Sequence, residues 1–268
     1  MPKRQASDFG LEITNNSKVG YAFSLPRSKT CIFKTEACAK VCYGNSIRYQ
    51  STAQKTKRVR NFRTVEFLLH HGGPALLAEN LVILIDRARP IDWIASTITG
   101  MDTHVPWTFR INDIGDFHKA SYAEAWTLAV KKRTDCSFWF YTRSFLDDKI
   151  FAALTELASQ PNCSGWLSLD RDNYEEGIIR YCQSQPGIWK IALLQERDEL
   201  MPSDLIPRLA SLARPGDLLS FPKHHAGRHV PVVRANNLTV CPQVTGSYKL
   251  ETSPDMPKPC QSCQLCLP

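Results

Sequence analysis

The stretch Ser137-Phe138-Trp139-Phe140-Tyr141-Thr142 is rich in aromatic side chains, and the amphipathic stretch Asp147–Ser159 follows it closely. Aromatic residues favour β-strands, whereas apolar residues that recur at helical spacing favour an α-helix. A second strand-like run, Gly165–Leu169, comes after this helix. The stretch therefore predicts a strand, a crossover helix and a second strand, which together form the repeating unit of a parallel sheet.

The same alternation extends in both directions from this unit. The expected strands are Gly20–Leu25, Trp107–Ile111, Ser137–Thr142, Gly165–Leu169, Trp189–Leu194 and Asp217–Phe221. The expected helices are Ile47–Leu69, Pro74–Arg87, Tyr122–Lys132, Asp147–Ser159, Tyr174–Gln183 and Pro202–Ala213. Because crossovers between parallel strands are right-handed, this order predicts an α/β fold, either a full or partial βα barrel or an open sheet. We prefer the barrel-like arrangement.

The alternation ends after Pro222, which divides the chain into two parts. We expect residues 1–222 to form the α/β domain, with a three-cysteine loop near its N-terminus. Residues 223–268 are rich in proline and cysteine and show no clear helix. We expect this cysteine-rich extension to pack back on the same domain.

Composition and charge restrict the partners that we expect. The chain has no apolar run of about 20 residues and no apolar segment behind its first basic residues, so we expect a cytoplasmic protein without a membrane anchor. Its formal net charge of +7 suggests an anionic partner, either nucleic acid or a phosphorylated small molecule. Five basic residues crowd one segment and could follow phosphates or form a solvated helix face: Lys55, Lys57, Arg58, Arg60 and Arg63.

The first of two cysteine groups has the spacing C-x6-C-x3-C and consists of Cys31, Cys38 and Cys42. In a reducing compartment, such groups indicate metal or redox chemistry rather than disulfides. Three thiolates in a short loop can bind three irons of a 4Fe-4S cluster and leave the fourth iron open for a ligand. Zinc sites more often have paired C-x2-C ligands. The spacing therefore favours an open-iron cluster.

The second cysteine group lies at the C-terminal end of the chain. Cys260, Cys263 and Cys266 have the C-x2-C-x2-C spacing of ferredoxin loops, and Cys241 offers a fourth thiolate. A fully ligated 4Fe-4S cluster here would transfer electrons or fasten the extension. Structural zinc is the alternative, and a further possibility is that both groups share one cluster. We expect the remaining three cysteines, Cys136, Cys163 and Cys182, to be buried apolar residues.

Polar side chains follow three consecutive predicted strands. In parallel α/β proteins, ligands bind at the carboxyl ends of the strands, so these side chains predict one pocket. The candidate pocket residues are Arg110, Asp113, Asp116, Tyr141, Arg143 and Asp170. Asp116 could instead cap the following helix.

Several of these motifs together resemble one family. They are Cys31, Cys38, Cys42-Tyr43-Gly44-Asn45, Gly115-Asp116-Phe117, Tyr141-Thr142-Arg143-Ser144 and the tail with Cys241-Pro242, Cys260, Cys263 and Cys266. This combination resembles the gene-product-eighty-eight family of phage and plasmid proteins. The resemblance spans about residues 20–266 and supports the cysteine pattern more than it implies a reaction.

A wider resemblance is to radical S-adenosylmethionine enzymes, which place a three-cysteine loop after the first strand of a partial βα barrel. Many of them carry an auxiliary cluster in a C-terminal extension. This resemblance implies that Cys31, Cys38 and Cys42 hold the cluster that binds S-adenosylmethionine, and that ferredoxin or flavodoxin donates electrons. The loop departs from the usual C-x3-C-x2-C spacing of that superfamily.

Two functions follow from these observations. The first is an iron–sulfur enzyme that acts on a nucleotide-like or nucleic-acid substrate. The alternative is a non-enzymatic iron–sulfur protein that binds nucleic acid as a replication or regulatory factor of a phage or plasmid. In the second case the clusters would be structural or redox-sensing, and the basic segment from Lys55 to Arg63 would contact phosphates.

Overall fold

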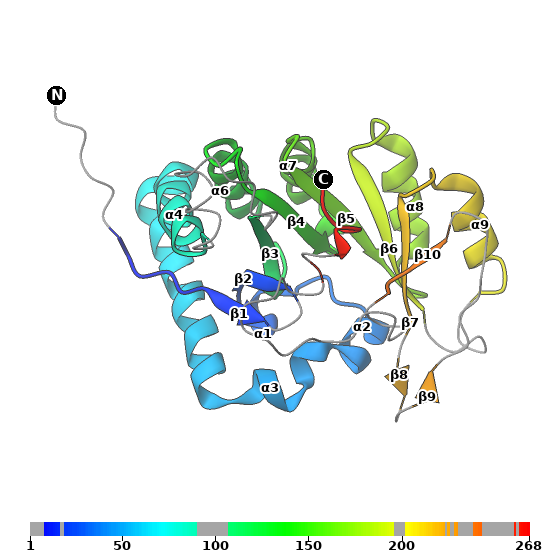
Figure 1. Ribbon diagram of the computed structural model, residues 1–268, viewed down its shortest axis with the longest axis horizontal. Coiled ribbons are helices and arrows are strands. Elements are labelled where there is room, and N and C mark those ends of the chain that lie inside the picture. The colour runs from blue at the N-terminus through cyan, green and yellow to red at the C-terminus, as the bar shows by residue number, and fades with distance from the viewer. Residues whose placement is uncertain are drawn as a thin grey trace, which may run out of the picture.

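The computed structural model describes residues 8–16, 19–89, 107–195, 202–222, 224–225, 228–229, 238–242, 260 and 263–268. Within these ranges the chain forms one eight-stranded sheet in the order β1-β2-β3-β4-β5-β6-β7-β10 (Figure 1). Its strands are β1 (Thr14–Asn16), β2 (Gly20–Ser24), β3 (Thr108–Ile114), β4 (Ser137–Thr142), β5 (Cys163–Leu169), β6 (Trp189–Gln195), β7 (Leu218–Pro222) and β10 (Thr239–Val240). Strands β8 (His224–His225) and β9 (Arg228–His229) form a separate antiparallel pair.

The strand order confirms the predicted α/β fold. β1 is antiparallel to β2, and the seven strands from β2 to β10 are mutually parallel. From β2 to β7 each strand lies beside the next one in sequence, which is the order of a βα barrel. The two edge strands, β1 and β10, do not pair with each other, so within the described ranges the sheet is open and corresponds to a partial barrel.

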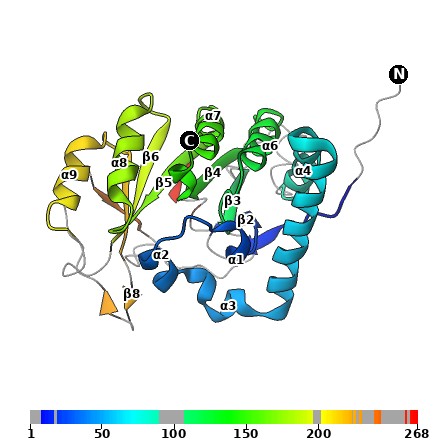
Figure 2. The same ribbon diagram turned by 180° about the vertical axis from the view of Figure 1, so that it is seen from behind.

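The helices follow the predicted alternation. The long helices are α4 (Thr52–Arg87), α6 (Ala120–Lys131), α7 (Asp148–Ala158), α8 (Tyr174–Gln183) and α9 (Leu205–Leu212). Shorter ones are α1 (Arg27–Thr30), α2 (Glu36–Val41), η1 (Tyr43–Asn45), α3 (Ile47–Gln50) and η2 (Ser144–Leu146). Helix α6 packs between α4 and α7, and α8 packs against α9, as both views show (Figures 1 and 2). This layer covers one face of the sheet, which we call the outer face.

Strand β4 shows how the two faces of the sheet differ. Phe138 and Phe140 are fully buried in the large core that the sheet shares with α4, α6 and α7. Side chains alternate along a strand, so Trp139 and Tyr141 lie on the opposite face, which we call the inner face. There they pack with Cys266, and the C-terminal residues lie across β4 and β5 (Figure 1). The inner face is therefore covered by the chain's own C-terminal segment.

Helix α4 joins the two helices that the sequence predicts on either side of Gly72. Gly73 has φ of 63° and ψ of −161°, and Pro74 follows it, so the helix kinks at this point. Among the described helices, α4 is the one that is long and apolar enough to cross a membrane, by length and composition only. Its side chains Leu77, Leu81 and Leu84 are fully buried in the core of this fold.

Two features differ from the sequence predictions. A further parallel strand, β10, lies beside β7 after Pro222; a two-residue strand is too short to leave a periodic pattern. Cys182 is exposed on α8, whereas Cys136 and Cys163 are buried as predicted. The predicted extension, residues 223–268, lies mostly outside the described ranges.

Candidate metal centres

The three-cysteine loop lies at the carboxyl ends of the parallel strands, because polar residues after β5 hold it there. The segment that the sequence predicts as an irregular loop contains helix α2. Thr35 caps this helix: its hydroxyl accepts a hydrogen bond from the Cys38 N–H (3.0 Å) and donates one to Asp170 Oδ2 (2.6 Å). The Ala37 N–H donates to Asp172 Oδ2 (2.9 Å). These bonds fix Cys38 beside the end of β5.

Cys38 and Cys42 lie close enough to Cys31 to affect the pKa of its thiol. Burial raises the pKa of the Cys31 thiol, and Asp116, Cys38 and Cys42 raise it further. Burial also raises the pKa of Cys38, while Arg143 opposes this increase. The three thiols therefore share one partly buried site, with the Asp116 carboxyl group and the Arg143 guanidinium beside them. A bound metal cation would favour the thiolate forms.

Asp116 connects the ends of β3 and β4 next to this site. Its carboxylate accepts hydrogen bonds from the Phe117 N–H, the Thr142 hydroxyl and the Arg143 N–H, each at 2.8 Å. Burial raises the pKa of Asp116, and these hydrogen bonds oppose the increase. The carboxylate accepts from both strand ends and does not cap α6, whose N-cap residue is Lys119.

Gly115 permits the turn that brings Asp116 to this position. Its φ of 96° lies in the left-handed region, and a Cβ atom there would lie 2.8 Å from Thr30 Oγ1 and 3.0 Å from the Leu25 oxygen. A side chain at residue 115 would therefore be strained and would collide with the segment that leads into the cysteine loop.

Arg143 and Asp170 complete the surroundings of the first cysteine group. The Arg143 guanidinium contacts Asp170 Oδ2 at 3.1 Å, and the Asp170 side chain is fully buried. Asp170 thus accepts from both Thr35 and Arg143. Of the six candidate pocket residues, Asp116, Arg143 and Asp170 are the three that lie beside the first cysteine group.

The other three candidates lie on or near the inner face of the sheet. The pairing of β2 with β3 runs from Ala22–Arg110 to Ser24–Ile114, so β3 carries extra residues at this point. Asn112, with φ of 57°, forms this bulge. The prediction that Asp113 lies in a loop after the strand is wrong, because the bulge lets β3 continue to Ile114. The Asp113 backbone oxygen accepts a hydrogen bond from the Tyr43 hydroxyl.

The second cysteine group surrounds one small pocket on the inner face. The pocket is lined by Leu219, Cys241, Pro242, Cys260, Cys263, Leu265 and Cys266. All four predicted ligand cysteines therefore meet at one place, although Cys241 precedes the others by about 20 residues. Burial raises the pKa of the Cys266 thiol to about 12, and Cys260 and Cys241 add to the increase.

Side chains of β4, β5 and β6 attach the C-terminal segment to this face. The Tyr141 hydroxyl donates to Cys266 Sγ (2.8 Å), and Trp166 Nε1 donates to the Cys266 oxygen (3.1 Å). Lys190 Nζ donates to the Leu267 oxygen (3.2 Å). Sequence reasoning identified Tyr141 but missed Trp166 and Lys190, although strand alternation places all three on the same face.

Both cysteine groups supply thiolate sulfur, the donor that iron–sulfur clusters and structural zinc sites both use. Within the described ranges, no three His, Cys, Asp or Glu side chains are arranged to hold a metal ion. A zinc ion with Zn–S bonds of about 2.3 Å draws its sulfurs closely together, whereas a cubane places one iron at each of four corners and its ligands stand further apart. Arg110 Nε is buried and has no hydrogen-bond acceptor among the described residues, so a donor remains for an anionic group.

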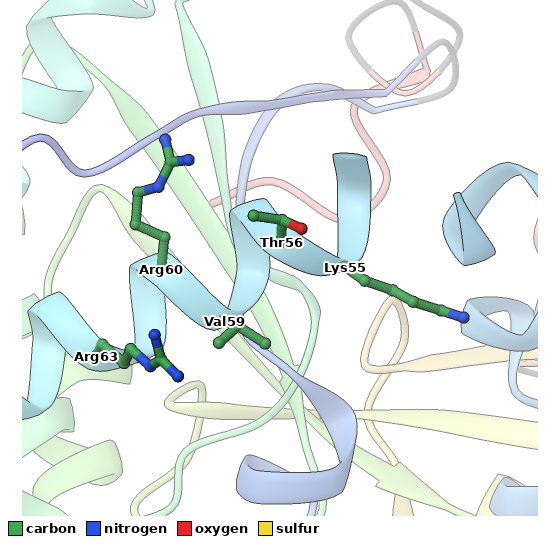
Figure 3. Close-up of a pocket in the computed structure, with 5 residues that line it drawn as sticks. All are labelled: Lys55, Thr56, Val59, Arg60 and Arg63. Atoms are coloured by element: carbon green, nitrogen blue, oxygen red, sulfur yellow. The ribbon is translucent and has the colours of Figure 1, made fainter. Parts of the chain in front are cut away.

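The predicted basic segment divides into buried and exposed members. Lys57 Nζ donates to the Ile13 backbone oxygen, and the Arg58 guanidinium donates to the Tyr49 backbone oxygen. Both side chains therefore stabilise the fold. Lys55, Arg60 and Arg63 are exposed and line a shallow pocket on α4 together with Thr56 and Val59 (Figure 3). Arg60 forms an ion pair with Glu12 at 2.5 Å. The exposed cations are therefore fewer than the sequence suggests.

Comparisons with known proteins agree with the family resemblance. The family model described as gene product 88 matches residues 3–267. The Gene 88 proteins of Mycobacterium phage L5 and Mycobacterium phage D29 are each 30% identical over 177 residues, which cover 63% of this chain and 65% of the relative. The match thus spans less than two thirds of the length of these relatives, and no solved structure matches the chain. Because the family model covers nearly all of the sequence, the chain belongs to the gene product 88 family of phage proteins.

Proposed function

We propose that this protein is an iron–sulfur enzyme with two 4Fe-4S clusters, one on each cysteine group. The observation that supports this proposal best is the gathering of seven cysteines at two places on one sheet. Cys31, Cys38 and Cys42 lie at the carboxyl ends of the strands, where ligands bind in βα barrels, while the other four line a pocket on the inner face. The three other cysteines of the chain belong to neither group.

In this proposal the first cysteine group provides the reactive site. Cys31, Cys38 and Cys42 would bind three irons, and the fourth iron would be open to S-adenosylmethionine or to substrate. The chemistry supplied there is the transfer of one electron to the bound ligand. Arg143, held by Asp170, places a cation beside Cys38 that can orient an anionic group of the ligand. Asp116 keeps the ends of β3 and β4 together beneath this group.

The second cysteine group would hold a fully ligated cluster. Cys241, Cys260, Cys263 and Cys266 give four thiolates, which leaves no open iron for a substrate. This site would receive electrons from a protein such as ferredoxin or flavodoxin and would fasten the C-terminal segment to the inner face. The net charge of +7 suits a nucleotide-like or nucleic-acid substrate and an acidic electron donor.

A non-enzymatic protein that binds nucleic acid is the second candidate function. Lys55 and Arg63 are exposed on α4, and both line one shallow pocket (Figure 3). Cations of this kind can contact successive phosphates. In this case the clusters would stabilise the fold or sense redox state, and the protein would act as a replication or regulatory factor.

The test of the enzyme proposal is the electron paramagnetic resonance spectrum of the reduced, anaerobically purified protein with and without S-adenosylmethionine. We expect the ligand to change the signal of the wild type and of Cys263→Ala, which keeps the first cysteine group. Cys38→Ala, which keeps only the second group, should show no change. An unchanged wild-type spectrum would remove S-adenosylmethionine from the proposal.

The second candidate predicts a different result with labelled single-stranded DNA. Its affinity would fall steeply with salt, and a Lys55→Gln, Arg63→Gln double variant would reduce the slope of log K against log salt by about 1.4, since each phosphate contact contributes about 0.7. Weak binding with no change of slope, together with a response to S-adenosylmethionine, would favour the enzyme.

A further inference from the structure

Arg110 lies on the inner face of the sheet, with Tyr43 and Tyr141 beside its guanidinium. In the pairing of strands it stands opposite Ala22 on one side and Trp139 on the other. Its guanidinium donates to the Tyr43 hydroxyl (3.1 Å) and lies 5.0 Å from the centre of the Tyr141 ring. Only 13% of its side chain is exposed, so the charge is held in a largely buried position.

Each aromatic partner of Arg110 leads to a different cysteine group. Tyr43 follows Cys42 directly in the sequence. Tyr141 donates its hydroxyl hydrogen to Cys266 Sγ, and Arg110 itself interacts electrostatically with Cys260. One cation is therefore linked to both groups, with a tyrosine on each side.

Among the described residues, the Arg110 guanidinium makes only a long ion pair with a carboxylate. Its nearest carboxylate oxygen is Asp113 Oδ1, at 3.5 Å, a distance beyond that of a strong hydrogen bond. Its Nε atom is buried and has no acceptor in the part of the chain that the structure describes. A buried guanidinium in this condition favours additional negative charge nearby.

We propose that Arg110 is a positioning residue shared by the two cysteine sites, which it links through Tyr43 and Tyr141 and to which it supplies a common positive charge. This inference rests on the two-cluster proposal above. Reduction adds one electron, and so one negative charge, to a cluster. A fixed cation stabilises the reduced state, so Arg110 raises the reduction potential of both sites.

Two other cations provide matched comparisons, because among the described residues each interacts with a cysteine of a different site. Arg143 lowers the pKa of Cys38 in the first group. Lys190 interacts electrostatically with Cys266 and lies over the Trp166 ring, at 5.3 Å from its centre. Removing the charge of Arg143 should therefore lower the reduction potential of the first site, and removing the charge of Lys190 should lower that of the second site. Removing the charge of Arg110 should lower the reduction potentials of both sites.

The experiment is a redox titration, followed by electron paramagnetic resonance, of Arg110→Gln, Arg110→Lys, Arg143→Gln and Lys190→Gln. Each substitution is measured in the Cys38→Ala and Cys263→Ala backgrounds, which isolate the second and first site respectively. For Arg110→Gln we expect the ratio of reduced to oxidised cluster at a fixed potential to fall about tenfold at both sites, or about 59 mV for a one-electron couple. Arg110→Lys keeps the charge and should shift both sites less.

Three results would overturn the inference. They are a shift at only one site in Arg110→Gln, a shift at neither site, or equal shifts in Arg110→Gln and Arg110→Lys. If Arg110→Gln does not fold, Arg110→Lys compared with Arg143→Gln still shows whether one or both sites respond. Failure of the two-cluster proposal itself is distinguishable, because the unsubstituted protein would then contain clearly fewer than about eight irons and eight sulfides.

Discussion

Replacing Asp116 with alanine is expected to lower the free energy of unfolding by about 3–5 kcal/mol, a large part of the total stability of a typical domain. The Asp116 carboxylate accepts hydrogen bonds from the Phe117 N–H, the Thr142 hydroxyl and the Arg143 N–H. Alanine would leave two buried donors and the partly buried Arg143 N–H without this acceptor, and each unsatisfied buried donor costs about 1–3 kcal/mol. Denaturant unfolding monitored by circular dichroism measures the change.

Two controls separate this effect from a general sensitivity of the region. Asp116→Asn keeps the shape and one acceptor oxygen, so it should lose less stability than Asp116→Ala. Thr142→Ser keeps the hydroxyl that donates to Asp116 and should remain close to the wild type. If Asp116→Ala unfolds at the same denaturant concentration as the wild type, the carboxylate does not hold the strand ends together.

Substituting one cysteine of either group is expected to remove about half of the bound iron and sulfide, because each group would hold one 4Fe-4S cluster. Cys38→Ala should empty the first site, and Cys263→Ala should empty the second. Cys182→Ala is the matched control, since Cys182 is exposed on α8 and belongs to neither group. It should keep the wild-type content. Loss of all iron in both Cys38→Ala and Cys263→Ala would instead indicate one shared cluster.

The elements with strong periodicity were predictable from the sequence. Helix α8 has the predicted bounds, Tyr174–Gln183, and strand β4 has the predicted bounds, Ser137–Thr142. The amphipathic pattern of α8 favours a helix, and the aromatic run of β4 favours a strand, so each segment has one favoured secondary structure. The position of β10 was not predictable, because two residues carry no period and their pairing with β7 depends on contacts distant in sequence.

The candidate sites were predictable in part. Spacing alone was enough to select the seven cysteines, and strand alternation could have added Trp166 and Lys190. The division of the polar residues was not predictable, because it depends on the bulge at Asn112. That bulge keeps Asp113 within β3, while Asp116 turns toward Thr142 after Gly115. A left-handed asparagine inside a strand has no reliable sequence signal, since tertiary contacts such as the Tyr122–Asn112 hydrogen bond impose it.

The two cysteine groups on one sheet are proposed to hold two iron–sulfur clusters. The content of iron, acid-labile sulfide and zinc in the full chain after anaerobic purification tests this directly. We expect about eight irons and eight sulfides per chain and no zinc. Zinc without sulfide would contradict this proposal, and would indicate that the cysteines fasten the C-terminal segment without redox chemistry.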